Sequence, residues 1–131
     1  MMVEFNREEG INWDPAAGGK TLARLLTSPQ LGLVGLLEDG SSTIGYFVLT
    51  WGFDLEWQGR DAFLTELFIV AERRGHGLGN DALFAIEEVA LQCEAHALHL
   101  LVRHDNAIAQ RLYREAGFTS PPRDFLTKTL G

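Results

Sequence analysis

Three alternating glycines and two adjacent arginines lie in the stretch VAERRGHGLGND, residues 70 to 81. An apolar run precedes the stretch and a helical pattern follows it. Backbone N–H groups at the start of a helix lack partners, and the helix dipole adds partial positive charge there. Because glycine lets an anion approach these groups, the segment from Arg74 to Gly79 predicts an anion cradle, to which Arg73 and Arg74 add charge. The alternative is a flexible loop whose glycines serve turns and close packing.

Two nucleotide-binding patterns match the chain only in part. The dinucleotide pattern Gly-x-Gly-x-x-Gly fits Gly75 and Gly77, but Asn80 stands where the third glycine belongs. A dinucleotide therefore stays as the weaker alternative ligand. Residues 14 to 21, DPAAGGKT, imitate the end of an ATP-binding P-loop, but Asp14 replaces the required first glycine. We interpret this second match as accidental.

The elements that must position the glycines follow from the apolar pattern. Residues 31–38 and 43–53 predict a hairpin joined by the DGSS turn. Residues 62–70 are apolar almost throughout, which predicts a central strand buried on both faces. Residues 78–93 show a helical apolar face, on which Cys93 is expected as a small core residue. Further predictions are an opening strand at 2–8, a short helix at 19–26, a buried strand at 97–103, a helix at 105–117 and a last strand at 124–130.

Composition narrows the class of protein. The net charge of −7 argues against a nucleic-acid binder, because such proteins need clustered Lys and Arg. The single cysteine excludes an intrachain disulfide and suits a reducing compartment such as the cytoplasm. No apolar run approaches the ~20 residues of a membrane span, so we expect a soluble protein without a membrane partner. The four histidines are not spaced for shared ligation, and we expect no metal.

Two motifs together resemble the GNAT superfamily of acyl-CoA-dependent N-acetyltransferases. The family's phosphate loop is Arg or Gln, two residues, Gly, one residue, and Gly or Ala, which Arg74, Gly77 and Gly79 match. The second motif is an Asn, a helix with a Tyr, and a Gly-Phe pair, here Asn106, Tyr113, Gly117 and Phe118. The resemblance runs from residue 44 to 118, while residues 1 to 30 match poorly and look shortened.

The resemblance implies a fold and a co-substrate. The fold is of the mixed α/β (α+β) type, a GNAT-like single domain over residues 1–131 with a central, mostly antiparallel mixed sheet whose central strands splay apart between flanking helices. Acetyl-CoA would lie between the splayed strands. Its pantetheine arm would bond to the main chain of Phe68, Ile69 and Val70 and to Asn106. Its pyrophosphate would be held by Arg73, Arg74, Gly75, His76, Gly77, Leu78, Gly79 and Asn80.

The resemblance also implies an acid and a base for direct acetyl transfer to an amine. Tyr113 would donate a proton to the departing sulfur, and N–H groups near Val70 would polarise the thioester carbonyl. Some relatives carry Leu-Glu-Asp-Leu on the strand before the loop, where this chain has Leu-Thr-Glu-Leu. Thr65 thus replaces the first acid, and Glu66 is the candidate base. The alternatives are a core aromatic at Tyr113 and a charge-paired strand residue at Glu66.

The acceptor is the least determined part of the prediction. Trp51, Asp54, Glu56 and Trp57 would suit a cation, and residues 45–68 look like the same region of diamine and thialysine acetyltransferases. We therefore expect a primary amine, either small, polyamine-like or lysine-like, or on a peptide. An ordinary hairpin with tryptophans at a homodimer contact is the alternative. The contrasting hypothesis for the whole chain is a non-catalytic acyl-CoA-binding or sensing module.

Overall fold

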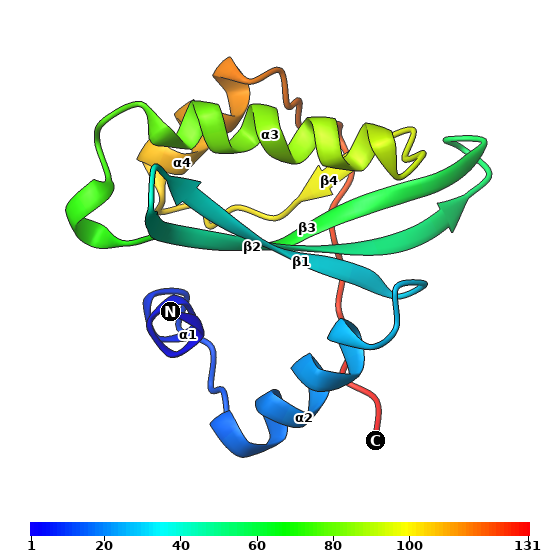
Figure 1. Cartoon of the computed structure of the whole chain (residues 1–131). Helices are drawn as coiled ribbons and strands as arrows, with labels where there is room; N and C mark the ends of the chain where they lie inside the picture. Colours follow the sequence, from blue (N-terminus) through cyan, green and yellow to red (C-terminus); the bar gives the residue numbers. More distant parts are fainter. The chain divides into compact units, whose positions relative to one another are not determined.

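The computed structural model describes residues 1–131 and divides into two compact units, residues 1–101 and 102–131. Figure 1 gives the course of the chain. The first unit contains α1 (Met2–Glu8), α2 (Pro15–Leu26), β1 (Gly32–Asp39), β2 (Ser42–Asp54), β3 (Gly59–Ile69), a 3-10 turn (Ala71–Arg73), α3 (Leu78–Gln92) and β4 (Leu98–Leu100). The second contains α4 (Ala107–Glu115).

One mixed sheet organises the first unit. Its strands follow the order β1-β2-β3-β4, with β1, β2 and β3 antiparallel and β4 parallel to β3. Figure 1 shows α3 crossing one side of this sheet, with α1 and α2 on the other. The mixed, mostly antiparallel sheet flanked by helices confirms the predicted fold class.

The double-sided core lies in β2 rather than in β3. Within β2, every residue from Ile44 to Leu49 is buried. In β3, Ala62 and Leu64 are buried, whereas Phe63 between them is half-buried and Thr65 is exposed. The prediction of burial on both faces of residues 62–70 is therefore wrong. The physical reason is that β2 has a strand on each side from Gly45 to Thr50, while β3 has its second neighbour only at Ala62–Leu64.

Two predicted strands do not form. Residues 2–8 form α1, because Met2 and Phe5 have helical spacing and pack against the cluster of Tyr46, Val48 and Phe68. Residues 124–130 are exposed and without regular structure, so their alternating pattern has no sheet to join. The predicted strand at 97–103 is confirmed only over Leu98–Leu100.

The P-loop imitation at residues 14–21 is the start of a helix. The Asp14 carboxylate accepts hydrogen bonds from the Ala16 N–H (3.2 Å) and the Ala17 N–H (3.4 Å), and Pro15 occupies the first helical position. These are the usual features of a capped helix start. The segment therefore cannot wrap a phosphate as a P-loop does.

We expect Asp14→Ala to lower the free energy of unfolding by about 1 kcal/mol, because two N–H groups of α2 lose their acceptor. Asp14→Asn keeps an acceptor oxygen and should retain most of the stability. Urea unfolding of both variants and the wild type measures the difference. Equal losses in the two variants would show that the cap bonds do not matter.

Candidate active site

The glycine loop presents backbone N–H groups that have no partner within the protein. Gly75 (φ +81°) and Gly77 (φ +75°) adopt left-handed conformations that favour glycine, and nothing lies within 4 Å of a Cβ built on either. Gly77 precedes α3, and no side chain caps the helix. No N–H group from residue 75 to residue 80 donates to an acceptor in the chain, whereas the Asp81 N–H reaches Gly77 O at 3.5 Å. The predicted row of free donors is therefore present, and it includes exposed His76.

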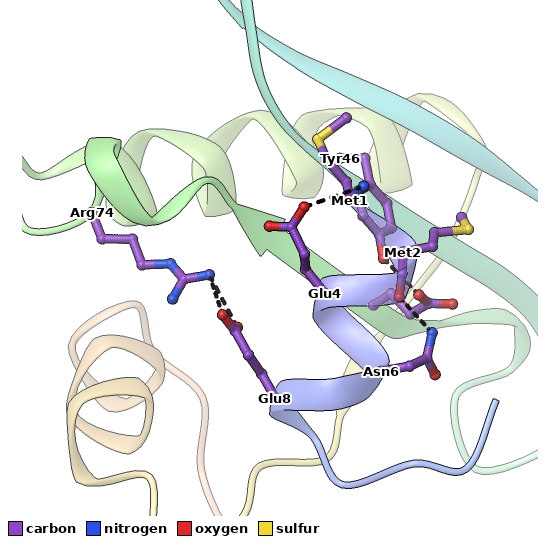
Figure 2. Close-up of polar contacts among 8 residues, drawn as sticks. Met1, Met2, Glu4, Asn6, Glu8, Tyr46 and Arg74 are labelled. Atoms are coloured by element: carbon purple, nitrogen blue, oxygen red, sulfur yellow. Dashed lines mark hydrogen bonds and ion pairs between the residues drawn. The ribbon is translucent and has the colours of Figure 1, made fainter.

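Both predicted phosphate-binding arginines are ion-paired with carboxylates from other elements. Arg73 pairs with Asp39 at the end of β1. Arg74 donates from Nη2 to both oxygens of Glu8 (3.0 and 3.2 Å) at the end of α1, as Figure 2 shows. These acids lie far away in the sequence, and sequence reasoning missed them. The positive charge beside the loop is therefore largely balanced within the protein.

The side chain of Arg74 also folds back along β3. Its Nε donates to the Ile69 carbonyl at 2.7 Å, and its guanidinium carbon lies 5.2 Å from the ring centroid of Phe68. The backbone N–H of Arg74 donates to Ala71 O. Three kinds of contact thus fix Arg74 against the end of β3 and against α1.

The splay of the central strands is visible in the pairing of β3. Its parallel pairing with β4 covers only Ala62–Leu64, opposite Leu98–Leu100, while its pairing with β2 continues to Ile69. The edge of β3 beyond Leu64 is therefore open. The Val70 N–H donates to Ile44 O at 2.8 Å, so by strand alternation the main-chain groups of Phe68 and Val70 face β2.

The same alternation turns the main chain of Leu67 and Ile69 toward the open edge. The Arg74 contact to Ile69 O agrees with this direction. Of the three residues that the family resemblance nominates for the pantetheine arm, only Ile69 faces the open edge. Leu67 was missed, and only the register against β2 could have found it.

A pocket of about 490 Å³ lies between the α1–α2 region and the sheet. It is lined by Met2, Asn12, Trp13, Asp14, Ala17, Gly18, Thr21, Leu22, Leu25, Val48 and Glu66. The pocket joins the carboxylates of Asp14 and Glu66 with the indole of Trp13. Glu66 thus borders a cavity, together with Trp13 and Asp14, which lie in the part of the sequence that matched the family poorly.

The Glu66 side chain, which lines this pocket, has one hydrogen-bond partner. The Tyr46 hydroxyl donates to Glu66 Oε1 at 2.8 Å. Burial raises the pKa of the Glu66 carboxyl above its ordinary value, and the bond from Tyr46 acts in the opposite direction. Burial, followed by the neighbouring carboxylate, raises the pKa of Tyr46 strongly. Tyr46 is therefore a neutral donor at physiological pH, and Glu66 is a stronger base than an exposed glutamate.

The hairpin residues predicted to hold the acceptor do not line the pocket. Trp51 donates from Nε1 to Pro29 O (3.1 Å) and lies under Arg60, whose guanidinium carbon is 5.1 Å from its ring. Asp54 accepts from the Glu56 N–H at 2.8 Å. Trp57 contacts His99, with 5.7 Å between ring centroids. These contacts make Trp51 and Asp54 structural members of the hairpin.

The second unit holds the remaining predicted site residues. Asn106 caps α4, because its Oδ1 accepts from the Ala109 N–H at 3.1 Å. The Tyr113 ring is half-buried and meets Phe118 edge-on, with 5.8 Å between centroids. Gly117 ends the helix with φ +97°. The motif residues Tyr113, Gly117 and Phe118 thus form one local structure at the end of α4.

No group of three or more His, Cys, Asp or Glu residues is placed to hold a metal ion. Cys93 is half-buried at the end of α3, and its carbonyl accepts from Arg60. None of the helices is both long and apolar enough to cross a bilayer.

Comparison with solved structures defines the class of fold. An integron cassette protein from the mobile metagenome of Cole Harbour Salt Marsh is 31% identical, with a TM-score of 0.84 over 99% of this chain and 80% of that chain. A predicted acetyltransferase from Clostridium acetobutylicum, crystallised with acetyl-CoA, has a TM-score of 0.74 at 17% identity over 92% of this chain and 80% of that chain. The second likeness shows the fold alone.

The family follows from the sequence comparison. The model of the Acetyltransferase (GNAT) family matches residues 1–118, so the chain belongs to this family. The match includes residues 1–30, where we expected little likeness.

The thialysine N-epsilon-acetyltransferase of Bos taurus is 31% identical over 78 residues, which are 60% of this chain and 45% of that protein. The enzyme of the same name from Mus musculus is 30% identical over 80 residues, which are 61% of this chain and 46% of that protein. The chain thus spans a little under half the length of these curated relatives.

The raised pKa of Glu66 predicts a pH dependence of stability. The folded protein binds this proton more tightly than the unfolded chain, so the contribution to stability is complete at low pH and is lost as pH rises from the unfolded pKa through the folded one. Glu66→Gln cannot ionise, so its stability relative to the wild type should grow as pH rises. Urea unfolding between roughly pH 4 and pH 8 measures this. The exposed Glu88→Gln is the control, and parallel curves for Glu66→Gln would contradict the prediction.

Proposed function

We propose that the protein transfers an acetyl group from acetyl-CoA to a primary amine. One observation carries the proposal: the unpaired N–H groups of residues 75–80 lie at the bare start of α3, directly after the strand that has the open edge. Family membership supports the reaction class. We treat residues 1–131 as one acetyltransferase domain, because the family match crosses from the first unit into the second.

The loop residues fit a pyrophosphate. Successive amide donors at a helix start bind anions, and the space around Gly75 and Gly77 admits a close approach. His76 and Asn80 are exposed and would add polar side chains. Arg74 would contribute only by exchanging its contacts with Glu8 and Ile69 O for contacts with the ligand.

The pocket beside Glu66 supports an amine that carries positive charge. Carboxylates from the N-cap of α2 and from β3, with an indole face, are groups that attract an ammonium. We therefore place the acceptor in this pocket rather than on the hairpin at Trp51 and Asp54. A lysine-like or polyamine acceptor is the finer proposal, which the likeness to thialysine acetyltransferases supports.

Glu66 would act as the base and Tyr113 as the acid. Bound acetyl-CoA would supply an acetyl group activated as a thioester. Glu66 takes a proton from the acceptor ammonium, and the freed nitrogen lone pair forms the C–N bond while the C–S bond breaks. The second nitrogen proton passes to water, and Tyr113 gives its phenol proton to the departing sulfur and regains one from water. The Ile69 N–H, which faces the open edge, is the candidate donor to the acyl oxygen, since that of Val70 is paired with Ile44.

A non-catalytic acyl-CoA-binding module is the second candidate. It is favoured by Thr65, which replaces an acid and donates to Val48 O at 3.4 Å, a long bond for a hydroxyl. Release of free CoA thiol across a panel of amines, including diamines and lysine analogues, separates the two. Thermal stabilisation by acetyl-CoA without thiol release on any amine or peptide would establish the binding module. Stabilisation by NAD but not by CoA would favour a dinucleotide binder instead.

A cytoplasmic location and a homodimer are proposals from the sequence. The half-exposed Trp57 on the β2–β3 hairpin is the residue that we would test at a homodimer contact.

Gly77→Glu should reduce acetyl-CoA affinity by at least about 10-fold, because it places bulk and negative charge where the pyrophosphate would lie. Gly19→Glu is the matched control, since Gly19 lies in α2 with nothing within 4 Å of its Cβ position. Gly77→Ala controls for the strained backbone conformation alone. Affinities come from calorimetry, and an unchanged affinity in Gly77→Glu would contradict the phosphate role of the loop.

Tyr113→Phe should lower kcat by roughly 10²-fold and leave the KM for acetyl-CoA unchanged, because the ring contact with Phe118 stays while the proposed proton donor is removed. Steady-state thiol release gives both constants. If the variant turns over at the wild-type rate, Tyr113 is a packing residue.

A further inference from the structure

The hydroxyl of Tyr46 is a polar group inside an apolar cluster. Tyr46 is 2% exposed and packs with the buried residues Val48 and Phe68. Met2, Phe5, Leu25, Val34 and Val70 surround this cluster. A buried hydroxyl without a partner would be costly. The acceptor that satisfies it is Glu66 Oε1, at 2.8 Å.

Aromatic contacts hold the Tyr46 ring on two sides. Its centroid lies 6.0 Å from that of Phe68 in a stacked arrangement and 6.4 Å from that of Phe5, which meets it edge-on. Figure 2 shows Tyr46 beside α1, the helix that carries Phe5. The ring therefore has little freedom, and its hydroxyl is a fixed donor rather than one that finds its acceptor by rotation.

Sheet register explains why the two side chains meet. Tyr46 pairs with Phe68 and Val48 pairs with Glu66, so Tyr46 and Glu66 are diagonal neighbours on antiparallel strands. The register shifts between Val48 and Leu49, where Thr65 has no partner in β2. The extra residue places Glu66 on the same face of the sheet as Tyr46, toward the pocket. This β-bulge thus determines the direction of the Glu66 carboxylate, and the Tyr46 phenol donates a hydrogen bond to one of its two oxygens.

We propose that Tyr46 is the positioning residue for Glu66: it fixes Oε1 through the phenol and leaves Oε2 to accept the proton of the acceptor amine. This inference rests on the proposed acetyltransferase function. Tyr46 is not a catalytic residue, because it acts only through Glu66. The bond stabilises the ionised carboxylate that burial alone would disfavour, so it keeps the base available at lower pH.

Other charged groups around Glu66 are few. Asp14, the N-cap of α2, lines the same pocket. In α1, Glu4 Oε1 lies 3.9 Å from the N-terminal amine of Met1, and Glu8 is ion-paired with Arg74. From β2, Tyr46 is the titratable group in contact. No Lys, Arg or His lines the pocket, so Tyr46 is the donor that supports the ionised form of Glu66.

The test is the pH profile of kcat/KM for the amine in the wild type, Tyr46→Phe and Phe5→Leu. Tyr46→Phe keeps the ring and should lower kcat about 10-fold, shift the acid limb to higher pH and leave the KM for acetyl-CoA unchanged. Phe5→Leu disturbs the packing of the same ring and should leave the acid limb in place. An unshifted acid limb in Tyr46→Phe would overturn the proposal.

A second variant keeps the proposal testable if Tyr46→Phe folds poorly. Glu66→Asp keeps a carboxylate but shortens the side chain, so the bond to Tyr46 is lost and the acid limb should shift in the same direction. Adding Tyr46→Phe to Glu66→Gln should cause no further loss of kcat, because the hydroxyl has no base left to position. A further 10-fold loss would show that Tyr46 acts independently of Glu66.

A readout without turnover separates the two proposals. Carbon-13 NMR titration of the Glu66 carboxyl, assigned by its absence in Glu66→Gln, should give a higher pKa in Tyr46→Phe than in the wild type. Equal pKa values would overturn the role of Tyr46, whatever the chain catalyses. A wild-type chain that acetylates no amine but shows the pKa difference would remove the proposed function and leave the Tyr46–Glu66 interaction standing.

Discussion

The early end of the pairing between β3 and β4 is the constraint on which the site depends. The pairing of β3 with β4 ends at Leu64 of β3. The main chain of Leu67 and Ile69 therefore has no strand on that side, while the other side of β3 remains paired with β2. That open edge leads through a short 3-10 turn into the glycine loop and α3. A fully paired β3 would have satisfied these groups internally and left no main chain to recognise a ligand.

The charge around the site is arranged in local pairs rather than as one positive patch. Asp39 and Glu8 balance the two arginines beside the loop, and the free donors there are neutral amides. The pocket near Glu66 is lined by acids without basic partners. An anion and a cation would therefore be attracted to different places, which suits the proposed reaction between an acyl donor that carries a pyrophosphate and a charged amine.

Sequence patterns predicted the parts whose signal is local. The glycine loop, the hairpin, α3 and α4 each depend on residues within a few positions of one another, and all are present. The strand predicted at 2–8 is wrong because seven residues carry no decisive period, and packing on Tyr46 selected a helix. The ion pairs of Arg73 and Arg74, the pocket at Trp13 and the Tyr46–Glu66 bond join residues distant in sequence, so no spacing rule could have revealed them.

The contact between Glu8 and Arg74 joins positions 66 residues apart. A helix of seven residues is too short to persist in water by itself, so α1 exists only while it is docked. The ordering of α1 and that of the glycine loop are therefore thermodynamically linked. Unfolding of α1 would change the stability of the loop at the start of α3. Amide hydrogen exchange in α1 would consequently report on events at the glycine loop, although no part of that helix belongs to it.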